Sequence, residues 1–238
     1  MQSPYGMELS GNCDTCPLRG EGFFCNLNKA ALKAFDAVKF TSGYPGGAVL
    51  FVEGEGPRGI YVLCRGKVKL TMTSSDGKTM ILRMVKPGEV LGLHAVVSGK
   101  PYQATAETME PCQVNFVRRD DFLRFLAQNS EASIHAAQQL SGDYQTACDQ
   151  IRSLGLSHSA TEKLAKFLLE TSAKGQETKQ GIRVRMTMTH EEIGQMIGAS
   201  RETVTRTLGE FRDRHLLVRN GSMLVIQDRA GLQSFAGA

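Results

Sequence analysis

Three cysteines lie close together near the start of the chain, in the stretch CDTCPLRGEGFFC that runs from Cys13 to Cys25. Cysteine thiolates bind zinc and iron–sulfur clusters, and two cysteines spaced C-x2-C can also form a thiol–disulfide couple. Cys13 and Cys16 have this spacing, and Cys25 follows Cys16 after eight residues. The stretch is therefore a candidate metal clasp or redox centre, unless its cysteines are plain thiols.

The composition is that of an ordinary globular protein. The chain has 238 residues, of which 41% are apolar and 22% charged, and this is enough for two modest globular domains. It has no apolar run long enough to span a bilayer, and its first residues lack the basic and apolar regions of a secretory signal. We therefore expect a cytoplasmic protein without a membrane partner, in which thiols and metal ligands are commoner than disulfides. The net charge of +4 permits a nucleic-acid partner without requiring one.

The elements that must position the cysteines begin with a Cys-bearing arm over residues 1–27. The segment NKAALKAFDAVKF over 28–40 has apolar residues at helical spacing. Short apolar or alternating runs separated by glycines follow, and SDGK at 75–78 carries an Asp-Gly hairpin signal. This pattern predicts a small β-sandwich or roll over 41–118. Residues 28–129 then form a β-roll domain.

A long helix is predicted over residues 130–155. Two stripes of small or apolar residues run along it. The first has the spacing of a coiled-coil seam and contains Ile134, Ala137, Ser141, Tyr144, Cys148 and Ile151. The second contains Ala136, Leu140, Ala147 and Leu154. The helix could therefore pack on its own domain or form a dimer seam.

The C-terminal stretch, residues 156–238, has the pattern of a helix–turn–helix followed by a β-hairpin. Thr189 and Glu192 have the spacing of a capping box at the start of one helix. A short GAS turn follows, and a second helix begins at about Ser200. The hairpin carries an Asn-Gly type I′ turn signal at 220–221. This order is typical of a winged DNA-binding domain.

The outward face of the second helix carries residue types that read base edges in DNA. Arginine donates two hydrogen bonds to guanine, and glutamate accepts one from cytosine. Both types lie at the N-terminal end of this helix, where a recognition helix meets the bases. The candidate DNA-binding residues are Ser200, Arg201, Glu202, Thr205 and Arg206. The alternative is an exposed charged face on which Glu202 and Arg206 pair with each other.

These stretches resemble a known family. TMTHEEIGQM followed by IGASRETVTRTLGEF closely resembles the recognition motif of the CRP/FNR family of bacterial transcription regulators. GIYVLCRGKVKL and VKPGEVLGLHAVVSG are similar to the family's β-roll segments, and the resemblance covers roughly residues 28–230. It implies an α+β protein with a cyclic-nucleotide-binding-type β-roll, a long dimerisation helix and a C-terminal winged helix–turn–helix. It also implies a homodimer that binds a palindromic site in double-stranded DNA and works with RNA polymerase.

The resemblance leaves the DNA half-site open between sequences related to TTGAT and to TGTGA. Glu202 and Arg206 match positions that the family shares. Arg201 resembles the residue of CRP, whereas Thr205 stands where FNR has serine.

Family members that bind cyclic AMP carry an Arg-Ser pair whose arginine meets the cyclic phosphate. This chain has Gln103-Ala104 at the corresponding place, so the phosphate would lack its charge-assisted partner. We therefore expect no cyclic AMP. His94 is a haem ligand only in principle, because a lone histidine is more often a loop residue.

The FNR branch resembles the chain further. Its members hold a [4Fe–4S] cluster with three cysteines of an N-terminal arm and a fourth cysteine of the β-roll, and four thiolates are what such a cluster needs. The implied ligands in this chain are Cys13, Cys16, Cys25 and Cys112. The gap between Cys16 and Cys25 is longer than in the best-known FNR pattern, but a longer loop closes at little extra entropic cost.

The two other cysteines are expected to have no such role. Cys64 lies in a strand context and is expected in the core, and Cys148 is a spare thiol on the long helix. Serine at Cys112 is then expected to abolish regulation, whereas serine at Cys64 is not.

The chain is therefore interpreted as a sequence-specific DNA-binding regulator that senses oxygen, nitric oxide or redox state through the cluster. Within the family, the alternative is a regulator whose arm binds zinc or nothing and that responds to an unknown small effector. A thiol–disulfide enzyme is the remaining alternative, but Cys13 and Cys16 lie in an irregular arm beside Pro17. We find no phosphate loop, nucleophile elbow or paired acidic cluster in the sequence, and we expect no enzymatic activity.

Overall fold

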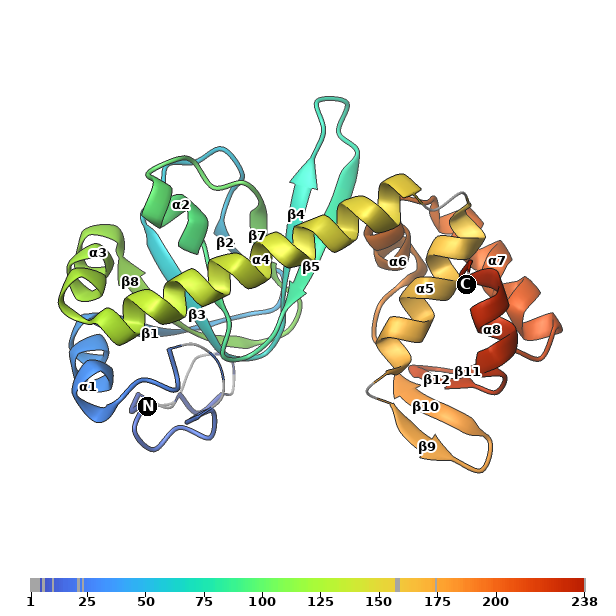
Figure 1. Ribbon diagram of the computed structural model, residues 1–238, viewed down its shortest axis with the longest axis horizontal. Helices are drawn as coiled ribbons and strands as arrows, with labels where there is room; N and C mark the ends of the chain where they lie inside the picture. Colours follow the sequence, from blue (N-terminus) through green and yellow to red (C-terminus); the bar gives the residue numbers. More distant parts are fainter. Residues whose placement is uncertain are drawn as a thin grey trace. The chain divides into compact units, whose positions relative to one another are not determined.

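The computed structural model describes residues 5, 7–9, 11–20, 22, 24–156, 159–173 and 175–237, apart from the side chains at 153, 154 and 156. The chain divides into two compact units, Met1–Gln145 and Thr146–Ala238. The first unit is built around two β-sheets, and the second combines helices with one small sheet (Figure 1).

The first unit is a β-roll flanked by helices. Its strands form two four-stranded sheets, in the orders β1-β8-β3-β6 and β2-β7-β4-β5. In chain order its elements are α1 (Lys29–Val38), β1 (Lys39–Tyr44), β2 (Val49–Phe51), β3 (Gly59–Arg65), β4 (Val68–Thr73), β5 (Thr79–Val85), β6 (Val90–Leu91), α2 (Leu93–Ser98), β7 (Thr105–Thr108), β8 (Cys112–Arg118), α3 (Arg119–Gln128) and the first half of α4 (Ser130–Leu156). The predicted β-roll is confirmed.

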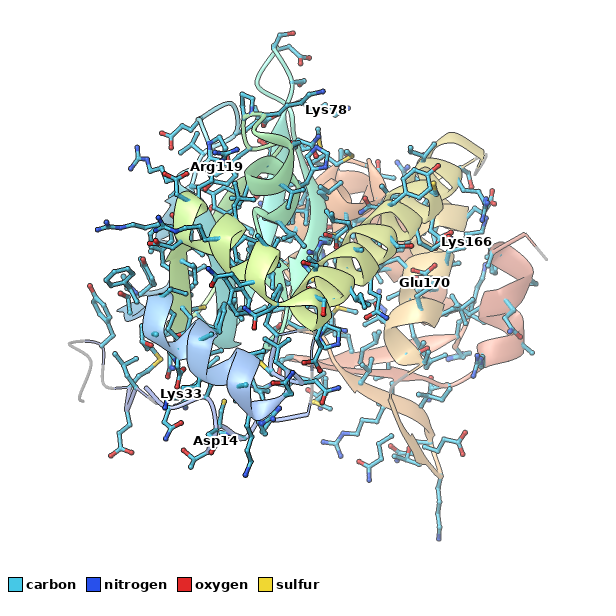
Figure 2. All side chains as sticks on the ribbon, turned by 60° about the vertical axis from the view of Figure 1, so that its left-hand side comes forward. Asp14, Lys33, Lys78, Arg119, Lys166 and Glu170 are labelled. Carbon is cyan, nitrogen blue, oxygen red and sulfur yellow. The ribbon has the colours of Figure 1, made fainter. Side chains whose placement is uncertain are left out.

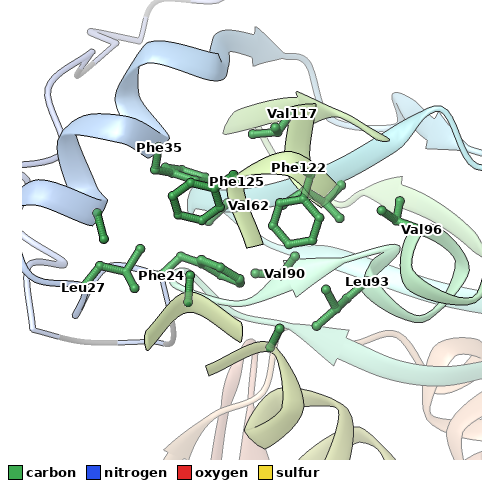
Figure 3. Packing of buried hydrophobic residues seen from close by; sticks show 14 of the residues in the cluster. Phe24, Leu27, Phe35, Val62, Val90, Leu93, Val96, Val117, Phe122 and Phe125 are labelled. Atoms are coloured by element: carbon green, nitrogen blue, oxygen red, sulfur yellow. The ribbon is translucent and has the colours of Figure 1, made fainter. Parts of the chain in front are cut away.

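Two apolar cores lie on opposite faces of the sheet β1-β8-β3-β6. We call the first the roll interior; it consists of Leu50, Phe51, Tyr61, Leu63, Val68, Leu70, Val85, Leu91, Ala95, Tyr102, Ala104, Ala106, Cys112 and Val114. We call the second the arm-side core (Figure 3); it consists of Phe24, Leu27, Ala31, Leu32, Phe35, Ile60, Val62, Val90, Leu93, Val96, Val117, Phe122, Phe125, Ala132 and Ala136.

The strands of this sheet alternate between the two cores, because successive side chains of a strand point to opposite faces. On β3, Tyr61 and Leu63 enter the roll interior, whereas Ile60 and Val62 enter the arm-side core. β8 pairs antiparallel with β3, with Ile60 opposite Val117. The sheet therefore separates the side chains that contact the arm from the side chains that fill the roll interior.

The two predicted stripes of α4 differ in their burial. Ala136 of the second stripe is buried in the arm-side core, and Leu140 packs against that core. On the first stripe, Ile134 is 58% exposed, and Tyr144 and Ile151 are each 72% exposed. The start of the second stripe thus packs on the helix's own domain, and Ile134, Tyr144 and Ile151 of the first stripe are left exposed. The side chain of Leu154 in the second stripe lies outside the described residues.

The division of the chain into two compact units falls within α4, between residues 145 and 146. The reason is that the buried residues of this helix are near its start. Ala132 and Ala136 are buried against the roll, and the Gln139 amide donates a hydrogen bond to the Val90 carbonyl at 2.7 Å.

The second unit is the predicted helix–turn–helix with a β-hairpin. Its small sheet has the strand order β11-β12-β10-β9. After the second half of α4 its elements are α5 (Ala160–Ser172), β9 (Gln176–Thr178), β10 (Gly181–Arg185), α6 (His190–Ile197), α7 (Arg201–Asp213), β11 (Leu217–Asn220), β12 (Met223–Ile226) and α8 (Arg229–Phe235).

Local signals explain where the elements of the second unit begin and turn. The capping box of Thr189 and Glu192 is present at the start of α6, as predicted. The wing turn lies one residue later than predicted, because Asn220 pairs with Met223 and the loop is Gly221 with Ser222. Gly221 has a φ of 58°, whereas the φ of Ser222 is not positive. This is the pattern of a type II′ turn, which requires glycine at its first position.

Candidate functional site

The first candidate site is the N-terminal end of α7. Ser200 caps this helix, and its hydroxyl oxygen accepts a hydrogen bond from the Thr203 N–H at 3.2 Å. Val204, Leu208 and Phe211 are buried beneath the helix. The five predicted DNA-binding residues are all exposed on its outer side: Ser200, Arg201, Glu202, Thr205 and Arg206. The predicted orientation of α7 is thus confirmed.

The charged residues of α7 are available to solvent rather than tied to each other. Arg206 approaches Glu210 at 3.9 Å, a long and exposed contact, instead of the Glu202 that the alternative reading paired with it. Hydrogen bonds from the backbone and from Ser200 hold the pKa of the Glu202 carboxyl below its ordinary value. The face therefore presents a carboxylate and guanidinium groups that can meet bases or phosphates.

A hydrogen-bonded chain connects the wing to α7. Arg219 of β11 donates to His190 Nε2 at 2.7 Å, and His190 Nδ1 lies 2.8 Å from the Thr205 hydroxyl. The Thr205 hydroxyl in turn donates to the Arg201 carbonyl at 2.9 Å. Burial and the neighbouring Arg219 and Arg201 lower the pKa of His190. A neutral histidine fits this chain, because Nε2 must accept from the arginine.

The sequence analysis missed His190 and Arg219. Both lie outside α7 in sequence, and 29 positions separate them. In the sequence, Arg219 is marked only by its place just before the wing turn, and His190 only by its place directly after Thr189, the cap of α6.

The second candidate site is the cysteine arm, which folds into a compact loop. The Cys16 N–H donates to the Cys13 carbonyl at 3.4 Å, and the Gly20 N–H donates to the Cys25 carbonyl at 3.1 Å. The Arg19 guanidinium donates to the carbonyls of Cys25 and Leu27 at 2.6 and 2.7 Å. These bonds close the loop between Cys16 and Cys25.

Aromatic packing anchors this arm to the β-roll. Phe24 is buried in the arm-side core, where its ring stacks on Phe35 at 5.8 Å and meets Phe122 edge-on at 5.6 Å (Figure 3). Leu27 is buried in the same core. Figure 2 shows the arm, marked by Asp14, beside α1, marked by Lys33.

Cys13 has a cationic neighbour. Lys39 Nζ donates to Cys13 Sγ at 2.8 Å and also pairs with the Asp36 carboxylate. The Lys39 side chain is only 5% exposed. Burial raises the pKa of the Cys13 thiol, and the hydrogen bond from Lys39 opposes this rise. Asn115 Nδ2 of β8 lies 4.0 Å from the same sulfur.

Cys64 lies next to the arm cysteines. Burial raises the pKa of its thiol to about 12, and the thiols of Cys25, Cys13 and Cys16 add to this rise. Burial likewise raises the pKa of Cys25 to about 11, with contributions from Cys16 and Cys13. The arm backbone also approaches this strand, because Gly22 lies against Gly88, whose N–H donates to the carbonyl of Leu63 next to Cys64. Cys64 was expected to be a plain core residue, but it is only half-buried.

Cys112 lies apart from the arm cysteines. It is fully buried in the roll interior with Val114, and its Sγ lies 3.1 Å from the Glu110 carbonyl and 3.4 Å from the Lys67 carbonyl. Burial raises the pKa of its thiol, and no other cysteine contributes. The structure thus brings together three of the four predicted ligands, Cys13, Cys16 and Cys25, and places Cys112 on the other face of the sheet. Cys148 is a half-buried thiol on α4.

The donor set of the arm fits an iron–sulfur cluster by its chemistry. Thiolates are the usual ligands of such clusters. Over the described part of the chain, no three Cys, His, Asp or Glu side chains converge closely enough to hold one metal ion. A four-iron cluster binds its thiolates on separate irons, so its ligands stand farther apart than those of a single ion.

Two family models match the chain. A cyclic nucleotide-binding domain matches residues 42–129, and a Crp-like helix-turn-helix domain matches residues 162–235. In the part of the chain that the structure describes, no helix is long and apolar enough to cross a membrane.

Curated relatives and solved structures agree with these models. The chain is 28% identical over 184 residues to the cAMP-activated global transcriptional regulator CRP of Pasteurella multocida, which covers 77% of this chain and 88% of the relative. It is 26% identical over 208 residues to a CRP-like cAMP-activated global transcriptional regulator of Mycobacterium tuberculosis, with 87% and 92% covered. The structure of FixK2 from Bradyrhizobium japonicum matches with a TM-score of 0.72 and 25% identity, over 84% of this chain and 98% of that one. A CooA mutant from Carboxydothermus hydrogenoformans shares the fold, with a TM-score of 0.74 and 21% identity over 89% and 93% of the two chains.

Proposed function

The chain belongs to the CRP/FNR family of transcription regulators, and we propose that it senses oxygen, nitric oxide or redox state through a [4Fe–4S] cluster held by its cysteine arm. It is a DNA-binding regulator with a Crp-like helix-turn-helix. The observation that supports the sensing proposal is that Cys13, Cys16 and Cys25 belong to one hydrogen-bonded arm, which packs on the roll. When bound, such a cluster supplies a redox-active group that oxygen and nitric oxide can attack.

The arm can act on α4 because both belong to the arm-side core. Phe24 and Leu27 of the arm share this core with Ala132 and Ala136 of α4. The backbone N–H and the side-chain amide of Asn28, the cap of α1, both donate to the Glu131 carboxylate of α4. If the arm leaves the roll, the start of α4 loses apolar contacts on one side.

We propose that α4 pairs with α4 of a second copy. The exposed seam with Ile134, Tyr144 and Ile151 supports this, because two such stripes could bury each other in a homodimer. The seam also contains Ser141 and Cys148 and is only half apolar. A weak seam suits a dimer whose stability depends on how the start of α4 is held. A two-fold dimer would place two α7 helices on a palindromic site.

Cyclic AMP is the effector in the names of the curated relatives, but the roll of this chain favours another signal. Gln103 is exposed and Ala104 is buried where the resemblance places the Arg-Ser pair. Tyr102 next to them is buried, and its hydroxyl donates to the Gly59 carbonyl at 2.7 Å. A cyclic phosphate at this place would meet neither a guanidinium nor a hydroxyl from residues 103 and 104.

The test is a DNA-binding titration on protein kept under strict anaerobic conditions. The anaerobic protein is expected to bind one palindromic family of sites, and its affinity is expected to fall after brief exposure to oxygen or to nitric oxide. Cyclic AMP serves as the comparison effector. A DNA affinity that is unchanged by oxygen and nitric oxide but rises with cyclic AMP would overturn the sensing proposal.

A further inference from the structure

We infer that the fourth thiolate of the cluster site is Cys64 on β3, and not Cys112 on β8. This inference rests on the proposed function, because it names a ligand for the cluster proposed there. It departs from the assignment that the family resemblance implies.

The face of the sheet decides between the two cysteines. On β8, Cys112 and Val114 enter the roll interior, whereas Asn115 approaches Cys13 and Val117 enters the arm-side core. Phe24 of the arm is buried on the second of these faces. Cys112 would therefore have to pass through the sheet to reach the arm.

Strand alternation puts Cys64 on the arm side of β3, because it continues the series of Ile60 and Val62, which enter the arm-side core. Leu63 pairs with Val114, and Arg65 pairs with Gln113, so two steps on β3 match one step on β8. Cys64 is the extra residue of this β-bulge. It follows Val62, whose cross-strand partner Asn115 lies 4.0 Å from the Cys13 sulfur. Cys64 is therefore on the arm side of the sheet, near the position of Cys13.

The backbone of the arm also approaches β3 at this point. The Gly88 N–H donates to the Leu63 carbonyl at 2.7 Å. Gly22 of the arm lies against Gly88, since a Cβ atom at Gly22 would come within 2.5 Å of the Gly88 carbonyl oxygen. Gly22 has a φ of 76°, which favours glycine. The loop between Cys16 and Cys25 is therefore seated beside the end of β3 that carries Cys64.

The surroundings of Cys112 fit a structural thiol. Its Sγ lies against the Gly66 backbone, where an added Cβ would come within 2.5 Å of the sulfur. It is enclosed by apolar side chains of the roll interior. The Sγ of Cys64, in contrast, makes a long hydrogen bond to the Val62 carbonyl of its own strand, at 3.7 Å.

The test compares single variants of the full chain, all purified anaerobically. Iron and acid-labile sulfide are measured per chain together with the absorption spectrum. Cys64→Ser is expected to lower the iron content at least several-fold, to the level of Cys13→Ser, whereas Cys112→Ala and Cys148→Ser are expected to keep the wild-type content. A cooperative thermal unfolding transition, measured on each variant, shows that it is folded.

The outcomes separate this inference from the proposed function. A wild-type cluster that survives Cys64→Ser, or that is lost in a folded Cys112→Ala variant, overturns the inference and leaves the sensing proposal standing. Should Cys112→Ala fail to fold, Cys112→Val fills the same apolar site and takes its place. A wild-type protein without iron and sulfide overturns the sensing proposal and the inference together. Loss of iron in Cys64→Ser alone supports both.

Discussion

Single side chains decide what each site can do. Lys39 places a nearly buried ammonium 2.8 Å from Cys13 Sγ, and the same ammonium pairs with the Asp36 carboxylate. A cation and a hydrogen bond to a ligand sulfur favour the more negative, reduced state of a cluster. Arg206 has the same importance for DNA, because it is exposed on the outer side of α7 and paired only weakly.

Lys39→Met tests the first of these roles. The substitution keeps the length of the side chain but removes the hydrogen bond and the charge. We expect a lower midpoint potential of the cluster and a lower iron content, measured by redox titration and iron analysis. Lys33→Met, on the exposed side of α1, is the matched control. Equal midpoint potentials for Lys39→Met and wild type would contradict this role.

Arg206→Ala tests the DNA contact. A guanidinium that reads a base contributes about 1–3 kcal/mol and specifies one base position. We expect a loss of this size in binding to the best site, with relaxed preference at that position only. Arg212→Ala, in the last turn of the same helix, is the control. A uniform loss over all DNA sequences would mean that Arg206 contacts only phosphate.

At the scale of elements, hydrogen-bonded and apolar contacts join parts that are distant in sequence. Arg219 of the wing reaches α7 through His190 and Thr205. α4 presents one stripe to the arm-side core and leaves the other exposed. We therefore expect the wing and α7 to act together, and the arm and the start of α4 to act together.

A double-mutant cycle tests the link between the wing and α7. His190→Ala and Arg219→Ala are expected to weaken DNA binding at pH 7.5 by less together than the sum of their separate effects, with a coupling of about 0.5–3 kcal/mol. Because the pKa of His190 is lowered in the folded protein, the neutral histidine holds this link fully above the ordinary histidine pKa, and the link is lost as the pH falls through the lowered pKa. If the effects of the two substitutions on the free energy of DNA binding are strictly additive, the link contributes nothing to binding.

Ile151→Glu tests the seam of α4. Burying an unpaired carboxylate costs several kcal/mol, so the dissociation constant of the dimer is expected to rise by more than about 100-fold. Sedimentation at several protein concentrations measures it. Gln138→Glu changes charge at an exposed position off the seam and is the control. If Ile151→Glu dimerises as strongly as wild type, the dimer uses another surface.

The sequence predicts these elements better than it predicts the cysteine site. Periodicity and caps indicate α6, α7 and the roll, because such signals are local. The contact of Asn115 with Cys13 joins residues 102 positions apart, and no local pattern reports it. The bulge at Cys64 depends on the register of β3 against β8, which is a property of the folded sheet. Cys112 shares the roll interior with Val114, two positions along the same strand, as strand alternation requires.

At the scale of the whole molecule, the account joins a sensor to a DNA-binding surface. Each unit contains one candidate site: the arm cysteines in Met1–Gln145 and the exposed face of α7 in Thr146–Ala238. α4 is the one element that belongs to both units. A change in how the arm holds the start of α4 is therefore the proposed route from signal to DNA binding.

The most direct measurement is the iron and sulfide content of protein purified without oxygen, with an absorption spectrum before and after brief exposure to air. The account predicts a brown protein with about four iron and four sulfide per chain that bleaches in air. A colourless protein without iron after the same anaerobic handling would contradict it, and would make an arm that binds zinc or nothing the better description of this regulator.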